Sequence, residues 1–288
     1  VINANWFAEI TPITGLTISA RYGLNIDNTR QNEMGNAYMG QSASYGGTAY
    51  QAAIRTYGFD QQYVANYQFA LKDVHHFDVT AGYDGYSYEY TLLEGSGQNL
   101  YNPESFYLGN VIDKFTIGGK KDLYSTKGFF GRVNYTMMDK YLLAVTVRAD
   151  GSSKFGSGNR WGVFPSAALA WRISDEAFMS NTQDWLSALK LRLSFGTAGN
   201  NRINSGLLST TYSLGGNDAR NPFFNGESTT MLEHGTNLYN PDLKWETTVT
   251  RNIGIDYGFW NNRISGAIDF YWNTTRDLLM RTEIPSLS

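Results

Sequence analysis

Histidine is the residue type in this chain best suited to bind a metal or transfer a proton, and the sequence contains three of them. His75 and His76 are adjacent at the start of a predicted strand, and His234 lies in a long predicted loop. Two neighbouring imidazoles form a metal site only when further ligands come from elsewhere in the fold. No ligand motif accompanies them, so we interpret the pair as solvated or inward-facing at a turn and predict no metal site.

Motifs for other chemistry are absent from the sequence. There is no cysteine, which excludes disulfides, thiolate catalysis and cysteine metal ligands. No serine-hydrolase elbow, zinc-protease motif, P-loop or dinucleotide-binding glycine motif occurs. Residues 150–153 (Asp-Gly-Ser-Ser) read as a strand-to-turn sequence with Gly151 at a positive φ, and they lack the carboxylates of a calcium loop. We therefore predict that the chain is not an enzyme, has no catalytic residue and binds no cofactor.

Aromatic residues are frequent in the predicted long loops, beside many Asn and Gly residues. Their rings and the amide side chains could stack on and hydrogen-bond to sugars or peptides, or could pack the loops against one another. Both interpretations stay open, and no substrate-binding residue is assigned. The loop aromatics are Tyr38, Tyr45, Tyr50, Tyr101, Tyr107, Phe115, Tyr212, Phe223 and Phe224.

The composition favours an all-β protein. Aromatic residues make up 15% of the chain and charged residues only 17%, below the roughly 25% of an average soluble domain. Membrane barrels carry such aromatic residues in girdles at the two lipid–water interfaces. No apolar run reaches the roughly 18 residues of a transmembrane helix. The net charge is −3, without a basic stripe, so nucleic acid is not an expected partner.

Residues of opposite character alternate along the predicted strands, and successive strand residues point to opposite faces. In residues 16–27 the even positions are apolar, except for the phenol of Tyr22, and the odd positions are small or polar. The same pattern recurs in residues 77–84, 129–137, 141–150, 189–198 and 263–273. On one face, Trp161 and Trp171 bracket an apolar set. Ten residues at about 3.3 Å each and a tilt of roughly 40° span about 25 Å, the height of a barrel's apolar band. We therefore predict lipid contact on this face.

Two strands depart from the pattern. Arg251 falls on the apolar face of the predicted strand 245–259, where it would cost roughly 2–4 kcal/mol at the membrane midplane. A bulge could turn it away, or it could face protein, and its placement stays open. Gln61 interrupts the aromatic face of residues 57–70.

The sequence predicts about ten strands with connections that alternate in length. Short connections at residues 12–15, 71–75, 138–140 and 260–262 alternate with long ones at 28–56, 93–126 and 199–244. Residues 174–188 form a longer turn with a short helical segment near Glu176–Phe178. Outer-membrane barrels have short periplasmic turns and long extracellular loops. The predicted strands are 4–11, 16–27, 57–70, 76–92, 126–137, 141–150, 161–173, 189–198, 245–259 and 263–275.

Several stretches resemble the SusC/RagA family of TonB-dependent outer-membrane transporters. They occur in the order and rough spacing of that family and together cover about residues 124–280, whereas residues 1–123 fit the preceding barrel strands more loosely. The stretches are 141–156 (YLLAVTVRADGSSKFG), 164–174 (FPSAALAWRIS), 176–178 (EAF), 189–200 (LKLRLSFGTAGN), 240–247 (NPDLKWET), 254–265 (GIDYGFWNNRIS) and 269–271 (DFY).

The resemblance implies a 22-stranded transmembrane antiparallel β-barrel filled by an N-terminal plug, of which residues 1–288 form one incomplete barrel domain without the plug. It also implies the partners: a SusD-like surface lipoprotein, the TonB–ExbB–ExbD energy complex acting through the absent plug, an oligosaccharide or peptide substrate, and outer-membrane lipid. Because lipid tolerates no open sheet edge, we expect the chain to be a piece of a longer protein.

Two other interpretations fit the alternation. A complete ten-stranded outer-membrane barrel, acting as a rim enzyme or an adhesin, has an even strand number and could close. A soluble all-β carbohydrate-binding domain would instead pack its apolar faces against a second sheet. Apolar side chains sealed in a water-excluding core would favour the soluble domain over either membrane barrel.

Overall fold

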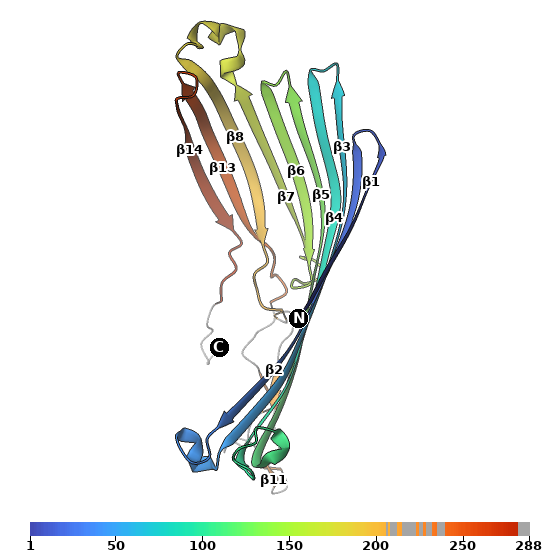
Figure 1. The fold of residues 1–288 in the computed structure, drawn as a ribbon, viewed down its shortest axis with the longest axis vertical. Coiled ribbons are helices and arrows are strands. Elements are labelled where there is room, and N and C mark those ends of the chain that lie inside the picture. Colours follow the sequence, from blue (N-terminus) through green and yellow to red (C-terminus); the bar gives the residue numbers. More distant parts are fainter. Residues whose placement is uncertain are drawn as a thin grey trace. The chain divides into compact units, whose positions relative to one another are not determined.

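Ten antiparallel strands form one sheet in which the strand order follows the chain (Figure 1). The computed structural model describes residues 1–205, 207 and 240–281, and the backbone of four short strands between residues 212 and 234. The strands of the sheet are β1 (Ile2–Ile13), β2 (Leu16–Gly35), β3 (Thr48–Leu71), β4 (His75–Leu100), β5 (Val111–Met137), β6 (Tyr141–Ser152), β7 (Trp161–Arg172), β8 (Leu186–Asn200), β13 (Glu246–Phe259) and β14 (Ile264–Arg276).

Short elements occupy the connections. The 3-10 helices are η1 (Gln41–Tyr45), η2 (Leu108–Asn110), η3 (Ile173–Asp175) and η4 (Ala177–Thr182). Two small ladders pair β9 (Tyr212–Leu214) with β12 (Leu232–His234) and β10 (Phe223–Phe224) with β11 (Glu227–Ser228). Within the part of the chain that is described, no helix has the length and apolar character needed to cross a membrane.

The chain divides into two compact units. The first comprises Val1–Ile10, Ile18–Tyr63 and Asp84–Thr126, and the second comprises Thr11–Thr17, Val64–Tyr83 and Lys127–Ser288. In the first unit a small apolar cluster forms where Leu108 packs on Ala49, Leu100 and Val111. In the second unit β6, β7, β8, β13 and β14 pair in sequence.

All ten predicted strands are present, and the sheet is open. β1 and β14 lie at its two edges and are not paired with each other. The described strands therefore do not form a closed ten-stranded barrel. An open edge in hydrocarbon would leave a row of backbone groups unpaired, so the sheet has the architecture of part of a larger barrel wall.

The predicted long connections at residues 28–56 and 93–126 are wrong over most of their length. β2 continues to Gly35, β3 begins at Thr48, β4 continues to Leu100 and β5 begins at Val111. Residues 28–33 are polar on both faces, and residues 48–56 and 111–126 contain apolar residues without a regular alternation. A strand shows alternating apolar and polar residues only where one of its faces contacts lipid or a protein core. The backbone hydrogen bonds between strands continue beyond that region, where the sequence no longer alternates.

The short turns lie where the sequence predicts them. Lys72 and Asp73, and likewise Met138 and Asp139, adopt positive φ at both central positions. This is the geometry of a type I′ hairpin, whose twist matches that of the flanking strands. The connection between β7 and β8 carries η3 and η4, which confirms the predicted helical segment near Glu176.

Apolar residues of the sheet are largely exposed. The described residues include only eight buried apolar side chains, too few for a soluble core of this size. On the face that carries Trp161 and Trp171, the side chains of Val163, Leu169 and Ile268 are 62%, 54% and 65% exposed. The water-excluding core required by a soluble domain is therefore absent from the described residues, and the face predicted to contact lipid is uncovered.

Candidate functional site

Aromatic pairs bracket the apolar face of the second unit. At the short-turn end, the Tyr141 and Trp171 rings stack with centroids 6.4 Å apart. At the other end of β7, the Trp161 ring stacks on the Phe129 ring of β5, with the ring centroids 6.0 Å apart. Tyr141 is also the register partner of Trp171 on the neighbouring strand. These pairs form the two interfacial girdles that the tryptophan spacing predicts.

Arg251 remains on the apolar face of β13. Its register partners are Phe195 and Trp272, and the only register shift between β13 and β8 falls at Gly258/Phe259. The guanidinium lies 6.0 Å from the centre of the Trp272 ring and donates to the Thr274 hydroxyl at 3.4 Å. A guanidinium over the face of an indole ring is attracted by the π electrons, so Arg251 has an interaction partner even in a weakly polar environment. The structure thus excludes a local bulge and shows a protein partner on the same face.

Charged side chains meet on the opposite, inward face of β8, β13 and β14. The Arg192 guanidinium donates to Asp256 through Nη2 at 2.7 Å and through Nε at 2.9 Å, and to Asp269 at 3.1 Å. Gly254 of β13 lies in register between Arg192 of β8 and Asp269 of β14. A side chain at this position would come within 2.8 Å of the Arg192 guanidinium. The glycine therefore gives Arg192 the room to reach two strands. All three side chains are about one-third exposed, so the cluster shapes a wetted polar wall and adds modestly to stability.

An aromatic cluster joins two loops at the long-loop end. Phe155 is fully buried, and its ring centre lies 5.3 Å from that of Trp245. Phe164 approaches the same indole at 5.4 Å, edge to face. The Trp245 indole N–H donates to the Arg160 carbonyl oxygen at 2.8 Å. Two stretches that resemble the family, residues 141–156 and 240–247, thus meet in space.

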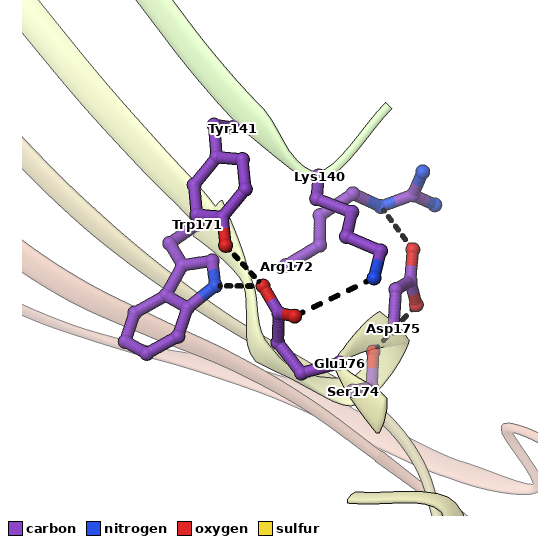
Figure 2. A network of polar contacts seen from close by, with 7 residues as sticks. All are labelled: Lys140, Tyr141, Trp171, Arg172, Ser174, Asp175 and Glu176. Carbon is purple, nitrogen blue, oxygen red and sulfur yellow. Dashed lines mark hydrogen bonds and ion pairs between the residues drawn. The ribbon is translucent and has the colours of Figure 1, made fainter. Parts of the chain in front are cut away.

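A carboxylate organises the girdle at the short-turn end. Glu176 Oε1 accepts hydrogen bonds from the Tyr141 hydroxyl at 2.6 Å and from the Trp171 indole N–H at 3.0 Å (Figure 2). Its other oxygen pairs with Lys140 Nζ at 3.4 Å. Phe178 packs edge to face on Trp171 at 6.4 Å. Since aromatic belt residues need a partner for their polar ends, Glu176 fixes the β7–β8 connection to the rim of the sheet.

We expect this anchor to weaken in acid. The hydrogen bonds from Tyr141 and Trp171, and then the charge of Lys140, hold the pKa of Glu176 below its ordinary value of 4.5. A carboxylate with a lowered folded-state pKa stabilises the fold fully above its ordinary pKa, and that contribution is lost as the pH falls through the lowered value. Tryptophan fluorescence of the full-length protein between pH 7 and pH about 2.5 should therefore change below pH 4.5. Glu176→Gln should remove this transition.

The control for this titration is Glu104→Gln, because Glu104 lies in the connection between β4 and β5. This variant should keep the wild-type transition. An unchanged acid transition in Glu176→Gln would show that another group is responsible.

Of the three histidines, the structure describes the side chains of His75 and His76. His75 Nδ1 lies 2.7 Å from the Tyr135 hydroxyl, and the two rings stack. His76 is exposed, and the described residues contain no cluster of three metal-ligating side chains. The side chain of His234 lies outside the described residues.

The positive φ predicted for Gly151 is wrong, although the chain does pass from a strand into a turn within residues 150–153. β6 continues to Ser152, and Gly151 is not among the residues with positive φ. It remains a glycine position for a different reason. A side chain there would press against the Trp161 ring, whose atoms lie 3.1 Å away, and Trp161 occupies the girdle.

The described loop aromatics are mostly exposed, and two of them also contact a neighbouring side chain. Tyr38 and Tyr101 are 78% and 84% exposed. Tyr107 stacks on Phe106 at 4.6 Å, and Lys114 lies 5.4 Å from the centre of the Tyr45 ring. Two residues assigned to loops lie on strands instead: Tyr50 on β3, where its hydroxyl donates to Glu94 at 2.7 Å, and Phe115 on β5. The side chains of Tyr212, Phe223 and Phe224 lie outside the described residues.

The sheet, its two unlike faces and its girdles define the class of protein. It is a portion of a transmembrane antiparallel β-barrel, with an apolar outward face and a polar inward face. The family model described as TonB dependent receptor-like, β-barrel matches residues 2–287, which places the barrel in the outer membrane. The chain therefore belongs to the β-barrel family of TonB-dependent receptors, and within it to the SusC/RagA-like proteins.

Relatives agree with this assignment. TonB-dependent receptor SusC of Bacteroides thetaiotaomicron is 36% identical over 208 residues, which cover 68% of this chain and 20% of that protein. TonB-dependent receptor P26 of Formosa agariphila is 29% identical over 98% of this chain and 28% of its own length. The structure of the RagAB peptide transporter superposes with a TM-score of 0.86 at 29% identity, covering 99% of this chain and 31% of that one. The chain thus spans less than a third of each of these proteins.

Proposed function

We propose that this chain forms part of the wall of a TonB-dependent importer that carries a glycan or peptide nutrient across the outer membrane. The observation that carries the proposal is the two-faced sheet in a member of this receptor family. Its outward face suits lipid, and its inward face presents charges such as Arg192, Asp256 and Asp269 to water. A wall of this kind can line a gated passage and needs no bond-making residue, which supports a non-enzymatic role.

The proposed assembly has components outside these 288 residues. Residues 1–288 belong to one barrel domain that continues beyond both ends, and a plug domain fills it. TonB–ExbB–ExbD acts on the plug, and a SusD-like lipoprotein covers the extracellular opening. The name of the RagAB peptide transporter supports a peptide substrate by analogy, whereas the 36% identity to SusC is to a protein whose name specifies no substrate.

Growth of the source organism tests this function. Deletion of the gene for the whole protein should abolish growth on the transported nutrient class, and the full-length gene should restore it. Parallel cultures on oligosaccharides and on peptides as the sole carbon source would distinguish the two classes. Loss of TonB should reproduce the defect, because the plug opens only when TonB supplies energy.

Unchanged growth and unchanged uptake of labelled substrate on both nutrient classes would contradict the importer. Uptake that survives the loss of TonB would identify a passive channel instead.

A further inference from the structure

We propose that Arg30 of β2 and Arg55 of β3 bind a phosphate group of the outer-leaflet glycolipid. This site rests on the outer-membrane location of the chain and is independent of the transported nutrient. All the residues that form it belong to the first unit.

The first step is the face on which the two arginines lie. On β2 the outward set from Leu16 to Ile26 has even numbers, and Tyr22 of this set contacts Phe59 of β3. The same parity holds further along, where the Asn32 side chain accepts a hydrogen bond from Gln51 of β3 at 2.8 Å. Arg30 lies between these two points and shares the parity, and Arg55 shares the parity of Phe59 and Gln51. Both arginines therefore lie on the outward face.

The second step is their height along the strands. The outward apolar set of β2 runs from Leu16 to Ile26, and that of β3 ends at Tyr57. Ten residues at about 3.3 Å each and a tilt of roughly 40° again give about 25 Å, the full height of the hydrocarbon. Arg55 lies two residues before Tyr57 in the sequence, and Arg30 lies four residues after Ile26. Because β2 and β3 are antiparallel, both arginines lie beyond the apolar set on the side away from the short turns. Their guanidinium groups therefore reach the level of the outer-leaflet headgroups.

The third step is the charge of the site. Arg30 and Arg55 are both exposed, and neither has an ion pair or a hydrogen bond through its guanidinium within the described part of the chain. Together with Tyr57, Thr91 and Asn28, they line a groove of about 910 Å³. Glu89, which also lines the groove, is already paired with Lys121 at 2.9 Å. The groove thus presents two uncompensated positive charges, with hydroxyl and amide groups beside them.

The chemistry of the ligand follows from these groups. A guanidinium matches the geometry of phosphate through two parallel hydrogen bonds and stays charged at all relevant pH values. Below the arginines the outward face is apolar, so a ligand with acyl chains would contact both zones at once. A phosphorylated glycolipid of the outer leaflet has this combination of groups, whereas a free anion would gain nothing from the apolar zone.

Binding of lipid A to the purified full-length protein in a non-ionic detergent tests the proposal, with native mass spectrometry as the measurement. Each basic residue near an anionic membrane surface contributes about fivefold to the affinity. The double variant Arg30→Gln/Arg55→Gln should therefore bind about 25-fold more weakly, since the two contributions multiply. Arg30→Lys/Arg55→Lys should retain most of the affinity. Lys120→Ala, which removes a lysine from the opposite face of β5, should match the wild type.

Three outcomes would overturn the proposal. Equal affinity of the glutamine variant and the wild type would exclude the two arginines. Equal binding of dephosphorylated lipid A would show that the acyl chains alone determine the interaction. Displacement of lipid A by millimolar inorganic phosphate would identify a general anion site. Heat-modifiable migration on gels confirms that each variant is folded, and the single variants replace the double variant if it does not assemble.

Discussion

Replacement of Val147 by lysine should prevent normal assembly of the protein in the membrane, whereas lysine at the neighbouring Thr146 should be tolerated. Val147 lies on the outward face of β6, is 46% exposed and pairs in register with Pro165 of β7. A lysine on the lipid face costs about 2–4 kcal/mol near the midplane. Thr146 lies on the opposite face and pairs with Ser166, where a lysine remains in water. Leu143→Lys, on the same face as Val147, should behave like Val147→Lys.

The measurement is the amount of heat-modifiable protein in the outer-membrane fraction, together with folding into vesicles in urea. Because the same residue, lysine, is introduced at two adjacent positions, any effect of charge or size alone should be equal in the two variants. Equal defects for Val147→Lys and Thr146→Lys would contradict the assigned sidedness of β6, and with it the lipid contact of the whole face.

Removal of the Phe155 ring should release the loop between β6 and β7 while the strands remain intact. Phe155 is fully buried against Trp245, and truncation of such a ring to alanine costs about 3–5 kcal/mol. The Phe155–Trp245 contact holds residues 152–160 against residues 240–245. The loss of stability should therefore be confined to this loop. Hydrogen exchange of residues 151–162 should accelerate, and proteases should cut the loop.

Phe115→Ala is the control for this experiment, since Phe115 is 63% exposed and its loss should have little effect. Unchanged exchange in Phe155→Ala would mean that other contacts, such as the hydrogen bond from Trp245 to Arg160, hold the loop by themselves.

The sequence predicts the strands best where one face meets lipid. Residues 161–173 and 263–275 are predicted as strands, and the structure has Trp161–Arg172 and Ile264–Arg276. The far end of β2 escapes prediction because residues 28–33 are polar on both faces, and the far parts of β3 and β5 escape it because their apolar residues do not alternate regularly with polar ones. Arg251 shows a different limit, because its partner Trp272 lies on a neighbouring strand and only the register brings the two together.

The organising contacts of the candidate site could not be predicted for a related reason. Glu176 and Tyr141 are 35 positions apart, and their hydrogen bond depends on how the β7–β8 connection folds back. A carboxylate shortly after a girdle tryptophan is the one sequence signal that could have indicated it. The Phe155–Trp245 contact spans an even longer separation, across residues whose pairing the sequence does not encode locally.

The length of β5 has a consequence for how the protein can be handled from outside the cell. A strand of 27 residues is about 90 Å long at 3.3 Å per residue, far more than the bilayer requires. Most of the surplus backbone is tied into ladders rather than into hairpin tips. Epitope tags, labels and engineered cleavage sites therefore belong in residues 36–40 and 102–107, because Gly46 and Gly47 accept hydrogen bonds from β4 and Leu108 packs in the apolar cluster.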